Sequence, residues 1–489
     1  MAIAPATEQP AVRRWGVLRA GSLVFVLLTT VLCGVTLVLG FANKERCVGP
    51  TYDASGRSTP DYSTRVARDV CYSDIQQLWI GRGIDDHVFP YVSGGFRPPS
   101  QLYGGSLEYP VLTGVVIWLS ALPADTDGQF LAWSAIPLAV AGLLSAALLA
   151  WLAGLRSWWF ALAPPLVLYA FHNWDLLAVA STVVACWALL RLPPPVPGGS
   201  DGGPGPGGPG VDDGSAVRRR RLVVAAVALG LGGAFKLYPL MFVLPVALFL
   251  VLGEGAADRA VRSAAARWRS GLAFAAGAFG VCLAANLPFM VVGFRGWWAS
   301  FQFQWSRPID LTTNSIWFWA FRPESNSDNA ATQALMAQWA TVTTFAGLLL
   351  AVGLGFIRYR REGVYPWLAV AAAMLCAYLL FNKVHSPQFT LWLLPFFVLL
   401  RIPVGWILAY FTVDAAMGVG FFRWMYLLGT GAPAGVYDAI SPQLVLIGVW
   451  GRAGLLVALF VAFLRARAVP TATANGQAGR TKITADSSG

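Results

Sequence analysis

The chain has 489 residues, of which 56% are hydrophobic, 13% aromatic and only 12% charged. Its mean hydropathy is +0.59, and repeated apolar runs are long enough to cross a hydrocarbon core of about 30 Å. These values exclude a water-soluble globular protein and predict an all-α polytopic membrane protein. The net charge of +11 does not indicate a nucleic-acid partner, because the arginines stand between apolar runs, where the positive-inside rule accounts for them.

The amino-terminal segment predicts a retained first helix. Arg13, Arg14 and Arg19 precede an apolar run from about Leu23 to Phe41. This run is too long for the core of a signal peptide and lacks a clear small-residue cleavage site. We therefore expect residues 1–14 to be a cytoplasmic amino terminus and residues 15–469 to form one transmembrane domain.

The polar stretch that follows, residues 42–108, is predicted to fold outside the membrane. It contains Cys47 and Cys71, and an external loop faces an oxidising compartment, so these two are candidates for a disulfide. The remaining cysteines lie in apolar runs and are interpreted as small core residues: Cys33, Cys186, Cys282 and Cys376. There is no CxxC pair, HExxH motif or Walker-type glycine loop. We expect no cofactor and no metal site, and leave dependence on a divalent metal open.

Three apolar segments follow this loop, and three crossings would place the next polar turn on the cytoplasmic side. Residues 111–122, 130–153 and 158–170 cannot all cross the membrane if the next polar turn is external. The pair Pro164-Pro165 favours the third segment as re-entrant or interfacial, because non-helical backbone at membrane depth must be covered by protein. In total we expect a bundle of about 12 transmembrane helices.

Further along, two stretches are predicted to lie outside the helices. Residues 192–217 are rich in proline and glycine and are predicted to be a disordered cytoplasmic linker, as the tail 470–489 is predicted to be disordered. Residues 295–333 form a second large external loop that contains Trp297, Trp298, Trp305, Trp317 and Trp319. Tryptophan at this density is typical of an interfacial belt, and sugar stacking is the alternative.

Arginine clusters give the expected orientation. They lie within 218–221, 259–269, 358–361 and 465–467 and should be cytoplasmic, together with both termini of a multi-pass plasma-membrane protein. Three polar turns interrupt the apolar runs between them: Phe171-His172-Asn173-Trp174-Asp175, Phe235-Lys236-Leu237-Tyr238-Pro239 and Asn382-Lys383-Val384-His385-Ser386-Pro387-Gln388. These turns should meet at the extracytoplasmic face, where ionisable groups at membrane depth indicate a functional site.

The residues expected at this face suit the transfer of a group from a lipid phosphate. Asp74, in the first external loop, can act as a general base towards an acceptor hydroxyl. Lys236, Lys383 and His385 can hold a phosphate leaving group while negative charge develops on it. Each has a structural alternative: a loop aspartate commonly caps a helix, a lysine at depth can extend to the interface without another role, and His385 before Ser-Pro can simply end a helix.

The order of these motifs resembles that of the polyprenyl-phosphate-sugar-dependent glycosyltransferases of the GT-C superfamily. The resemblance comprises a first helix, a long extracytoplasmic loop with an early acidic residue, a Tyr-Pro re-entry at Tyr109, a Lys-Leu-Tyr-Pro turn at Lys236 and a Ser-Pro-Gln-Phe-x-Leu-Trp-Leu-Leu-Pro segment from Ser386. It extends over about residues 14–464 and is closest to actinobacterial family 87, the α-mannosyltransferases that act on glycolipids. At 171–175 the chain departs from the family, since His-Asn-Trp-Asp replaces Gly-Gln-x-Asn, and the subfamily and substrate stay open.

The resemblance implies a GT-C-type bundle that transfers a hexose, by default mannose, from a polyprenyl-phosphate sugar to a lipid-linked or glycolipid acceptor. Transfer would invert the anomeric centre, from a β donor to an α product. Asp74 would be the catalytic base, and Lys236, His385 and Lys383 would bind the donor phosphate. Six more residues are expected to contact substrate: Glu108, Tyr109, Tyr238, Gln388, His172 and Asp175. Acceptor identity and oligomeric state stay open.

Other functions are compatible with parts of this pattern. A transporter or lipid flippase also has charges at helix breaks, but usually with an inverted repeat, which we do not detect. A non-catalytic scaffold is a third class, in which Asp414 and Arg452 would form a structural ion pair. Within the first loop, Asp85 and Asp86 are alternatives to Asp74 as the base and lie further from the first helix.

Overall fold

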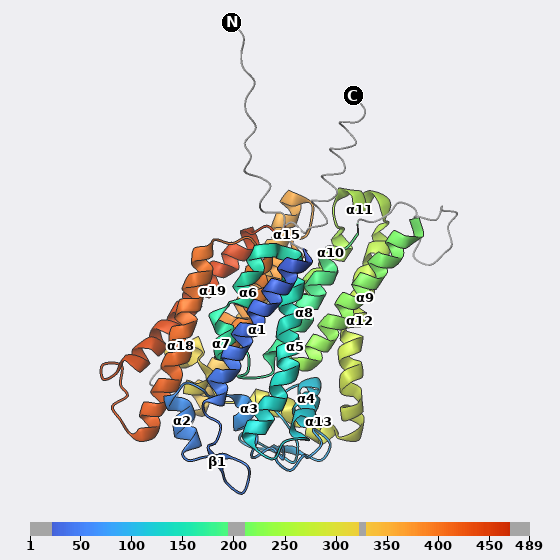
Figure 1. Cartoon of the computed structure of the whole chain (residues 1–489). Coiled ribbons are helices and arrows are strands. Elements are labelled where there is room, and N and C mark those ends of the chain that lie inside the picture. Colours follow the sequence, from blue (N-terminus) through green and yellow to red (C-terminus); the bar gives the residue numbers. More distant parts are fainter. Residues whose placement is uncertain (1–21, 194–210, 322–328, 470–489) are drawn as a thin grey trace.

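A computed structural model describes residues 22–193, 211–321 and 329–469, and this part of the chain is mostly helical (Figure 1). Within it, six helices are long and apolar enough to cross a membrane: α1 (Leu23–Glu45), α5 (Asp127–Ala153, extended by η2, Gly154–Ser157, and α6, Trp158–Ala161), α12 (Ala264–Val292), α15 (Ala330–Glu362), α18 (Val404–Thr430) and α19 (Ile440–Arg465). The fold is therefore that of an all-α polytopic membrane protein, as predicted.

Shorter apolar helices complete the bundle. They are α4 (Val111–Ala121), α8 (Asp175–Leu189), η3 with α10 (Tyr238–Phe242 and Val243–Leu252), α16 (Trp367–Phe381) and η5 with α17 (Pro387–Phe389 and Thr390–Leu399). α9 (Val211–Phe235) and α7 (Pro164–Tyr169) pack among them, and α11 (Ala256–Val261) connects α10 to α12. The polar turns of the sequence fall between these segments: one between α7 and α8, one between α9 and η3, and one between α16 and η5.

The first external loop folds into two small hairpins and two short helices. β1 (Thr51–Tyr52) pairs with β2 (Ser58–Thr59), and β3 (Gly95–Arg97) pairs with β4 (Gln101–Tyr103), both antiparallel. α2 (Tyr62–Arg68) and α3 (Asp74–Gln77) lie between the hairpins. A disulfide joins Cys47 to Cys71, which ties the segment before α3 to the end of α1. Because α1 continues to Glu45, the loop begins slightly later than predicted.

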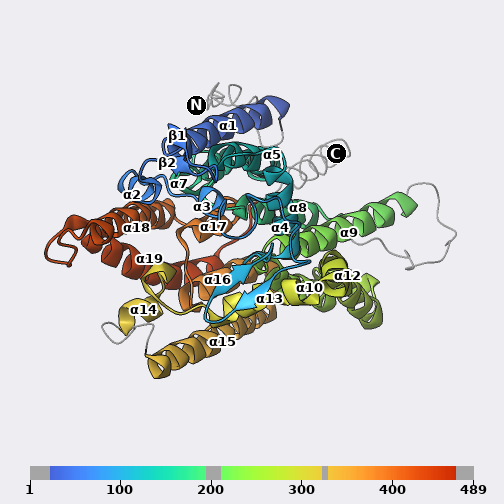
Figure 2. The same cartoon turned by 90° about the horizontal axis from the view of Figure 1, so that it is seen from below.

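Seen from the side, α2, α3, β1, α4 and α13 (Phe294–Ser306) gather at one end of the bundle (Figure 1). Seen from that end, α16 and α17 lie centrally, and α1, α9, α12, α15, α18 and α19 lie around them (Figure 2). Every residue of α17 is buried, whereas α12 and α15 bury few of theirs. The outer helices therefore present apolar surface of the kind that a bilayer covers.

The last two long helices pack closely around a buried ion pair. A Cβ atom on Gly448 of α19 would lie 2.4 Å from the Cβ of Met417 on α18, so only glycine allows this approach. One turn away, Arg452 Nη1 lies 3.6 Å from Asp414 Oδ1, and both side chains are fully buried. The ion pair foreseen for these two residues is therefore present.

Of the three apolar segments that follow the first external loop, α4 is the one that does not cross the bundle. The prediction that residues 158–170 are re-entrant or interfacial is therefore wrong. The Tyr91 hydroxyl of the first loop donates to the carbonyl of Pro110, 3.2 Å away, just before α4 begins. Near the other end of α4, Trp118 Nε1 donates to the carbonyl of His87, 3.0 Å away. Both ends of α4 thus contact the same external loop.

Residues 158–170 instead run from the carboxyl end of α17 to a turn that contacts the first external loop. On one side Arg156 donates to the carbonyl of Leu400, 2.6 Å away. On the other side the carbonyl of His172 accepts the amide of Asp74, 2.8 Å away. Pro164 and Pro165 did not break this path because they occupy the first positions of α7, where proline fits a helix without loss of a hydrogen bond.

Two predicted boundaries also change. α9 begins at Val211, so helix replaces the end of the predicted linker, and the proline-rich composition ends before that point. The second external loop is largely helical, with α13, η4 (Leu311–Thr313) and α14 (Ile316–Ala320), and it ends before Ala330 rather than at 333. The predictions for 1–14, 194–210 and 470–489 concern residues outside the described part.

Candidate functional site

The three polar turns and both external loops line a cavity of about 910 Å³ at one end of the bundle. The prediction that the three turns converge is confirmed. Eight of the predicted site residues line the cavity: Asp74, Glu108, Tyr109, His172, Lys236, Tyr238, Lys383 and Gln388. The volume is at the upper end of the usual range for small-molecule sites, about 300 to 1,000 Å³.

Asp74 is fixed at the cavity wall by the first turn of α3. Ser73 caps this helix by accepting the amide of Ile75 at 3.2 Å, and its hydroxyl donates to the carbonyl of Phe171 at 2.7 Å. The amide of Asp74 donates to the carbonyl of His172 at 2.8 Å. The external loop is thereby clamped to the turn between α7 and α8, so the half-buried Asp74 carboxylate has a defined position.

Two side chains orient the carboxylate of Asp74. The Tyr72 hydroxyl donates to Oδ1 at 2.9 Å, and Asn173 Nδ2 donates to Oδ2 at 3.0 Å. Burial raises the pKa of Asp74 above its ordinary value, while these hydrogen bonds and the charges of Lys236 and Arg307 act in the opposite direction. The result is a carboxylate that is more basic than an exposed aspartate and is held in one orientation, as a general base requires.

Lys236 lies in a box of aromatic rings with one carboxylate. Its Nζ is 3.0 Å from Asp175 Oδ1, and it lies 5.5 Å from the ring centroid of Tyr109, 5.4 Å from that of Phe389 and 5.8 Å from that of Trp392. Trp392 Nε1 donates to the same oxygen of Asp175 at 2.8 Å. Asp175 is fully buried and does not line the cavity. The expected contact of Asp175 with substrate is replaced by a contact with Lys236.

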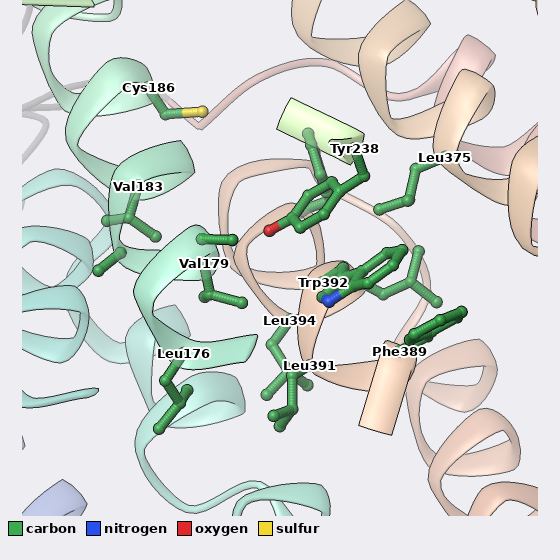
Figure 3. Packing of buried hydrophobic residues seen from close by; sticks show 14 of the residues in the cluster. Leu176, Val179, Val183, Cys186, Tyr238, Leu375, Phe389, Leu391, Trp392 and Leu394 are labelled. Atoms are coloured by element: carbon green, nitrogen blue, oxygen red, sulfur yellow. The ribbon is translucent and has the colours of Figure 1, made fainter. Parts of the chain in front are cut away.

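An aromatic stack supports this box from behind. Tyr238 stacks on Trp392 with ring centroids 4.1 Å apart, and Phe389 stacks on Trp392 at 4.0 Å. Figure 3 shows these three rings, with Phe389 on the side of Trp392 that faces away from Val179 of α8. The stack joins the Lys236 turn to η5, so it fixes the positions of Lys236 and of Gln388 in η5 relative to each other.

Further cations line the cavity. Lys383 Nζ donates to the carbonyls of Trp305 and Arg307, at 3.0 and 3.1 Å, and burial, with a smaller effect of Arg307, lowers the pKa of Lys383 to about 8. Arg307 itself lines the cavity, as does Arg82, which lies 3.3 Å from the carboxylate of Glu108. Arg307 was not among the residues predicted from the sequence.

His385 does not line the cavity, although its neighbours Val384 and Ser386 do. Its amide donates to the carbonyl of Thr313 at 2.8 Å, and burial lowers the pKa of its imidazole well below the ordinary value. Because His385 does not line the cavity, this geometry does not support its predicted contact with the donor phosphate, which stays a prediction.

Other candidates from the sequence lie elsewhere. Asp85 and Asp86 are not among the cavity-lining residues. In the described ranges, no three His, Cys, Asp or Glu residues are grouped as metal ligands would be. The tryptophans of the second loop do not share one role: Trp297 lines the cavity, whereas Trp305 is largely exposed.

The fold and the site thus define a polytopic membrane protein with a half-buried carboxylate and several cations around one cavity. Comparison with protein families gives a match to the model described as mannosyltransferase (PIG-M), over residues 215–422, which is less than half of the chain. The matched part includes the Lys236 and Lys383 turns and supports, at this coarse level, a membrane glycosyltransferase. No curated protein sequence matches significantly.

Solved structures give only distant likenesses. ArnT from Cupriavidus metallidurans, bound to undecaprenyl phosphate, is 14% identical with a TM-score of 0.36, covering 90% of this chain and 78% of that one. The apo oligosaccharyltransferase of Archaeoglobus fulgidus is 12% identical with a TM-score of 0.39, covering 92% of this chain. The chain spans only 57% of that oligosaccharyltransferase. Likenesses at this level carry no conclusion about substrate or residues.

Proposed function

We propose that the protein is a GT-C-type membrane glycosyltransferase that uses a polyprenyl-phosphate sugar. The transferred group is a hexose, and the family match over 215–422 favours mannose. The acceptor is a lipid-linked or glycolipid hydroxyl, and the cavity opens at the extracytoplasmic face of the plasma membrane. The observation that carries the proposal is that Asp74, Lys236, Arg307 and Lys383 line one cavity. A base and several cations in one cavity are the groups that displacement from a sugar phosphate needs.

The proposed reaction is a single displacement with inversion. The acceptor oxygen forms a bond to the anomeric carbon while the bond from that carbon to the phosphate oxygen breaks. The acceptor hydroxyl gives its proton to the carboxylate of Asp74. The bonding electrons leave with the phosphate, so that polyprenyl phosphate departs with an additional negative charge. A β-linked donor then gives an α-linked product.

The cations act on the leaving group. Lys236 is already neutralised in part by Asp175 at 3.0 Å, so Arg307 and Lys383 supply most of the remaining positive charge. Charges that are fixed before the reaction stabilise the developing phosphate charge without reorganisation in the transition state. Tyr72 and Asn173 hold the carboxylate of Asp74, and so they act as positioning residues for the base.

Transfer from labelled polyprenyl-phosphate mannose to endogenous lipid, in membranes that contain the protein, tests the proposal. Asp74→Asn should lower kcat about 10²- to 10⁴-fold, the usual contribution of a general base. Asp86→Asn is the matched control, because Asp86 is an exposed acid of the same loop. Full activity of Asp74→Asn would remove this residue from the mechanism. No transfer by the parent protein would overturn the proposal and favour a transporter or lipid flippase.

A further inference from the structure

Two buried side-chain amides on the cavity wall have oxygens without partners. Asn314 and Gln388, which we call the amide pair, line the cavity and are only 1% and 4% exposed. Among the described residues, neither Asn314 Oδ1 nor Gln388 Oε1 has a hydrogen-bond partner. A buried carbonyl oxygen without a donor is unfavourable, and native proteins keep few of them.

The amide of Asn314 is oriented by its own loop. Its Nδ2 lies 3.4 Å from the carbonyl of Thr312, an oxygen that can accept only from the NH₂ end, so Oδ1 is the free end. The backbone at Asn314 has a φ of +53°, in the left-handed region that asparagine tolerates better than most residues. A left-handed backbone conformation thus coincides with a buried, unpaired acceptor in a residue of the cavity wall, a combination associated with ligand contact.

The two loops that bear the amide pair are joined to each other. The amide of His385 donates to the carbonyl of Thr313 at 2.8 Å, one residue before Asn314. Trp317 Nε1 donates to the carbonyl of Phe381 at 2.7 Å. The second external loop and the segment between α16 and α17 are therefore connected at two points, one on each side of Asn314 and both before Gln388, so the two residues belong to one wall of the cavity.

The chemistry of the amide pair selects its ligand. An amide oxygen accepts hydrogen bonds and cannot donate them, and an ionised phosphate also has only acceptors. The free oxygens of the amide pair are thus unsuited to the phosphate, which the cations Arg307 and Lys383 of the same cavity can bind. Hydroxyl groups are the donors that a neutral sugar offers. The amide pair therefore matches the polyhydroxylated part of a sugar phosphate.

We propose that Asn314 and Gln388 accept hydrogen bonds from hydroxyl groups of the transferred hexose and so determine which hexose is accepted. The inference rests on the proposed glycosyltransferase function and adds a specificity site to it. A site built to bond a hydroxyl discriminates strongly against an analogue that lacks it, because the buried oxygen is then left unpaired. Loss of one such hydrogen bond should lower kcat/KM by a factor of about 5 to 150.

Monodeoxy analogues of the mannosyl donor test the inference. The parent protein should show kcat/KM lower by about 5- to 150-fold for at least one monodeoxy donor. Asn314→Gly keeps the left-handed backbone accessible and removes the amide; Gln388→Met keeps the length of the side chain and removes the acceptor. Each variant should lose activity on the full mannosyl donor but lose little more on the deoxy donor that lacks its hydroxyl partner.

Three comparisons make the result decisive. Asn314→Ala should be less active than Asn314→Gly, since alanine adds backbone strain to the loss of the amide. Gln77→Met is the matched control, because Gln77 lines the same cavity but is exposed, and it should leave the deoxy penalties unchanged. If both amide variants lose as much kcat/KM on every deoxy donor as the parent protein does, the amide pair does not bind the hydroxyl groups of the sugar. If the parent protein transfers no sugar and its thermal stability does not respond to the mannosyl donor, the proposed function falls as well.

Discussion

Substitution of Tyr72 by phenylalanine isolates one hydrogen bond to the proposed base. The hydroxyl of Tyr72 donates to Asp74 Oδ1 at 2.9 Å, while its ring stacks on Phe422 with centroids 5.3 Å apart. Phenylalanine keeps the stacking and removes only the hydroxyl. The bond from Asn173 to the other oxygen, at 3.0 Å, stays in place, so the orientation of Asp74 should be largely preserved.

The direction in which the pKa of Asp74 changes follows from the charge state that the hydrogen bond from Tyr72 favours. A hydrogen bond to an ionised carboxylate stabilises that form and lowers its pKa, so its removal raises the pKa of Asp74 further above its ordinary value. A hydrogen bond to a charged group contributes about 1.5 to 3 kcal/mol, and one pKa unit corresponds to about 1.4 kcal/mol. The acidic limb of the kcat/KM profile should therefore move about one to two pH units upward in Tyr72→Phe.

The assay is sugar transfer measured across the pH range in detergent or vesicles. Activity should fall most at acidic pH and approach the parental value on the alkaline side of the limb. Tyr52→Phe is the control, since Tyr52 lies in the same loop and is exposed. A uniform loss of rate with an unmoved acidic limb would refute the reasoning, because it would mean that the limb does not report Asp74.

Three further predictions concern the surroundings of the site. The pKa of Lys383 is lowered to about 8, so the donor KM should rise as pH increases through about 8; Lys383→Arg should abolish that limb, and its persistence would assign it to another group. Asp175→Asn should lower the free energy of unfolding by about 3 to 5 kcal/mol, because it leaves the Lys236 cation partly buried without a counter-ion. The double variant Asp175→Asn with Lys236→Met should regain most of this stability in chemical unfolding, and no recovery would contradict the pairing. Cys47→Ser with Cys71→Ser should cost about 3 kcal/mol in chain entropy for a sequence separation of 24; an unchanged thermal transition, with and without reductant, would argue against a constraint by the disulfide.

The parts of the site that the sequence analysis identified are those that depend on local patterns. Lys236, Lys383 and Gln388 stand where apolar runs break, and the alternation of arginine clusters puts those breaks at one end of the bundle. Asp74 was distinguished from Asp85 and Asp86 by its position relative to the first helix and by family resemblance. All four residues line the cavity, although their roles stay predictions.

Other residues could not be assigned in this way. Asp175 was expected to contact substrate, but it pairs with Lys236 across the contact between two helices. His385 lies in a motif together with Gln388, yet only Gln388 lines the cavity. Asn314 and Arg307 attracted no attention because single polar residues in a loop have no periodicity or spacing that marks them. Their positions depend on hydrogen bonds between distant segments.

The sequence by itself determined that the chain is a helical membrane bundle, because the hydrocarbon core requires long apolar segments with internally satisfied backbone groups. It also determined where the polar turns interrupt that bundle. Only the tertiary structure decided that α4 stays at one end, that Asp175 neutralises Lys236, and that Asn314 and Gln388 share one cavity wall. Helix formation depends on residues a few positions apart, whereas the pairing of buried polar groups depends on which segments meet after the helices have packed.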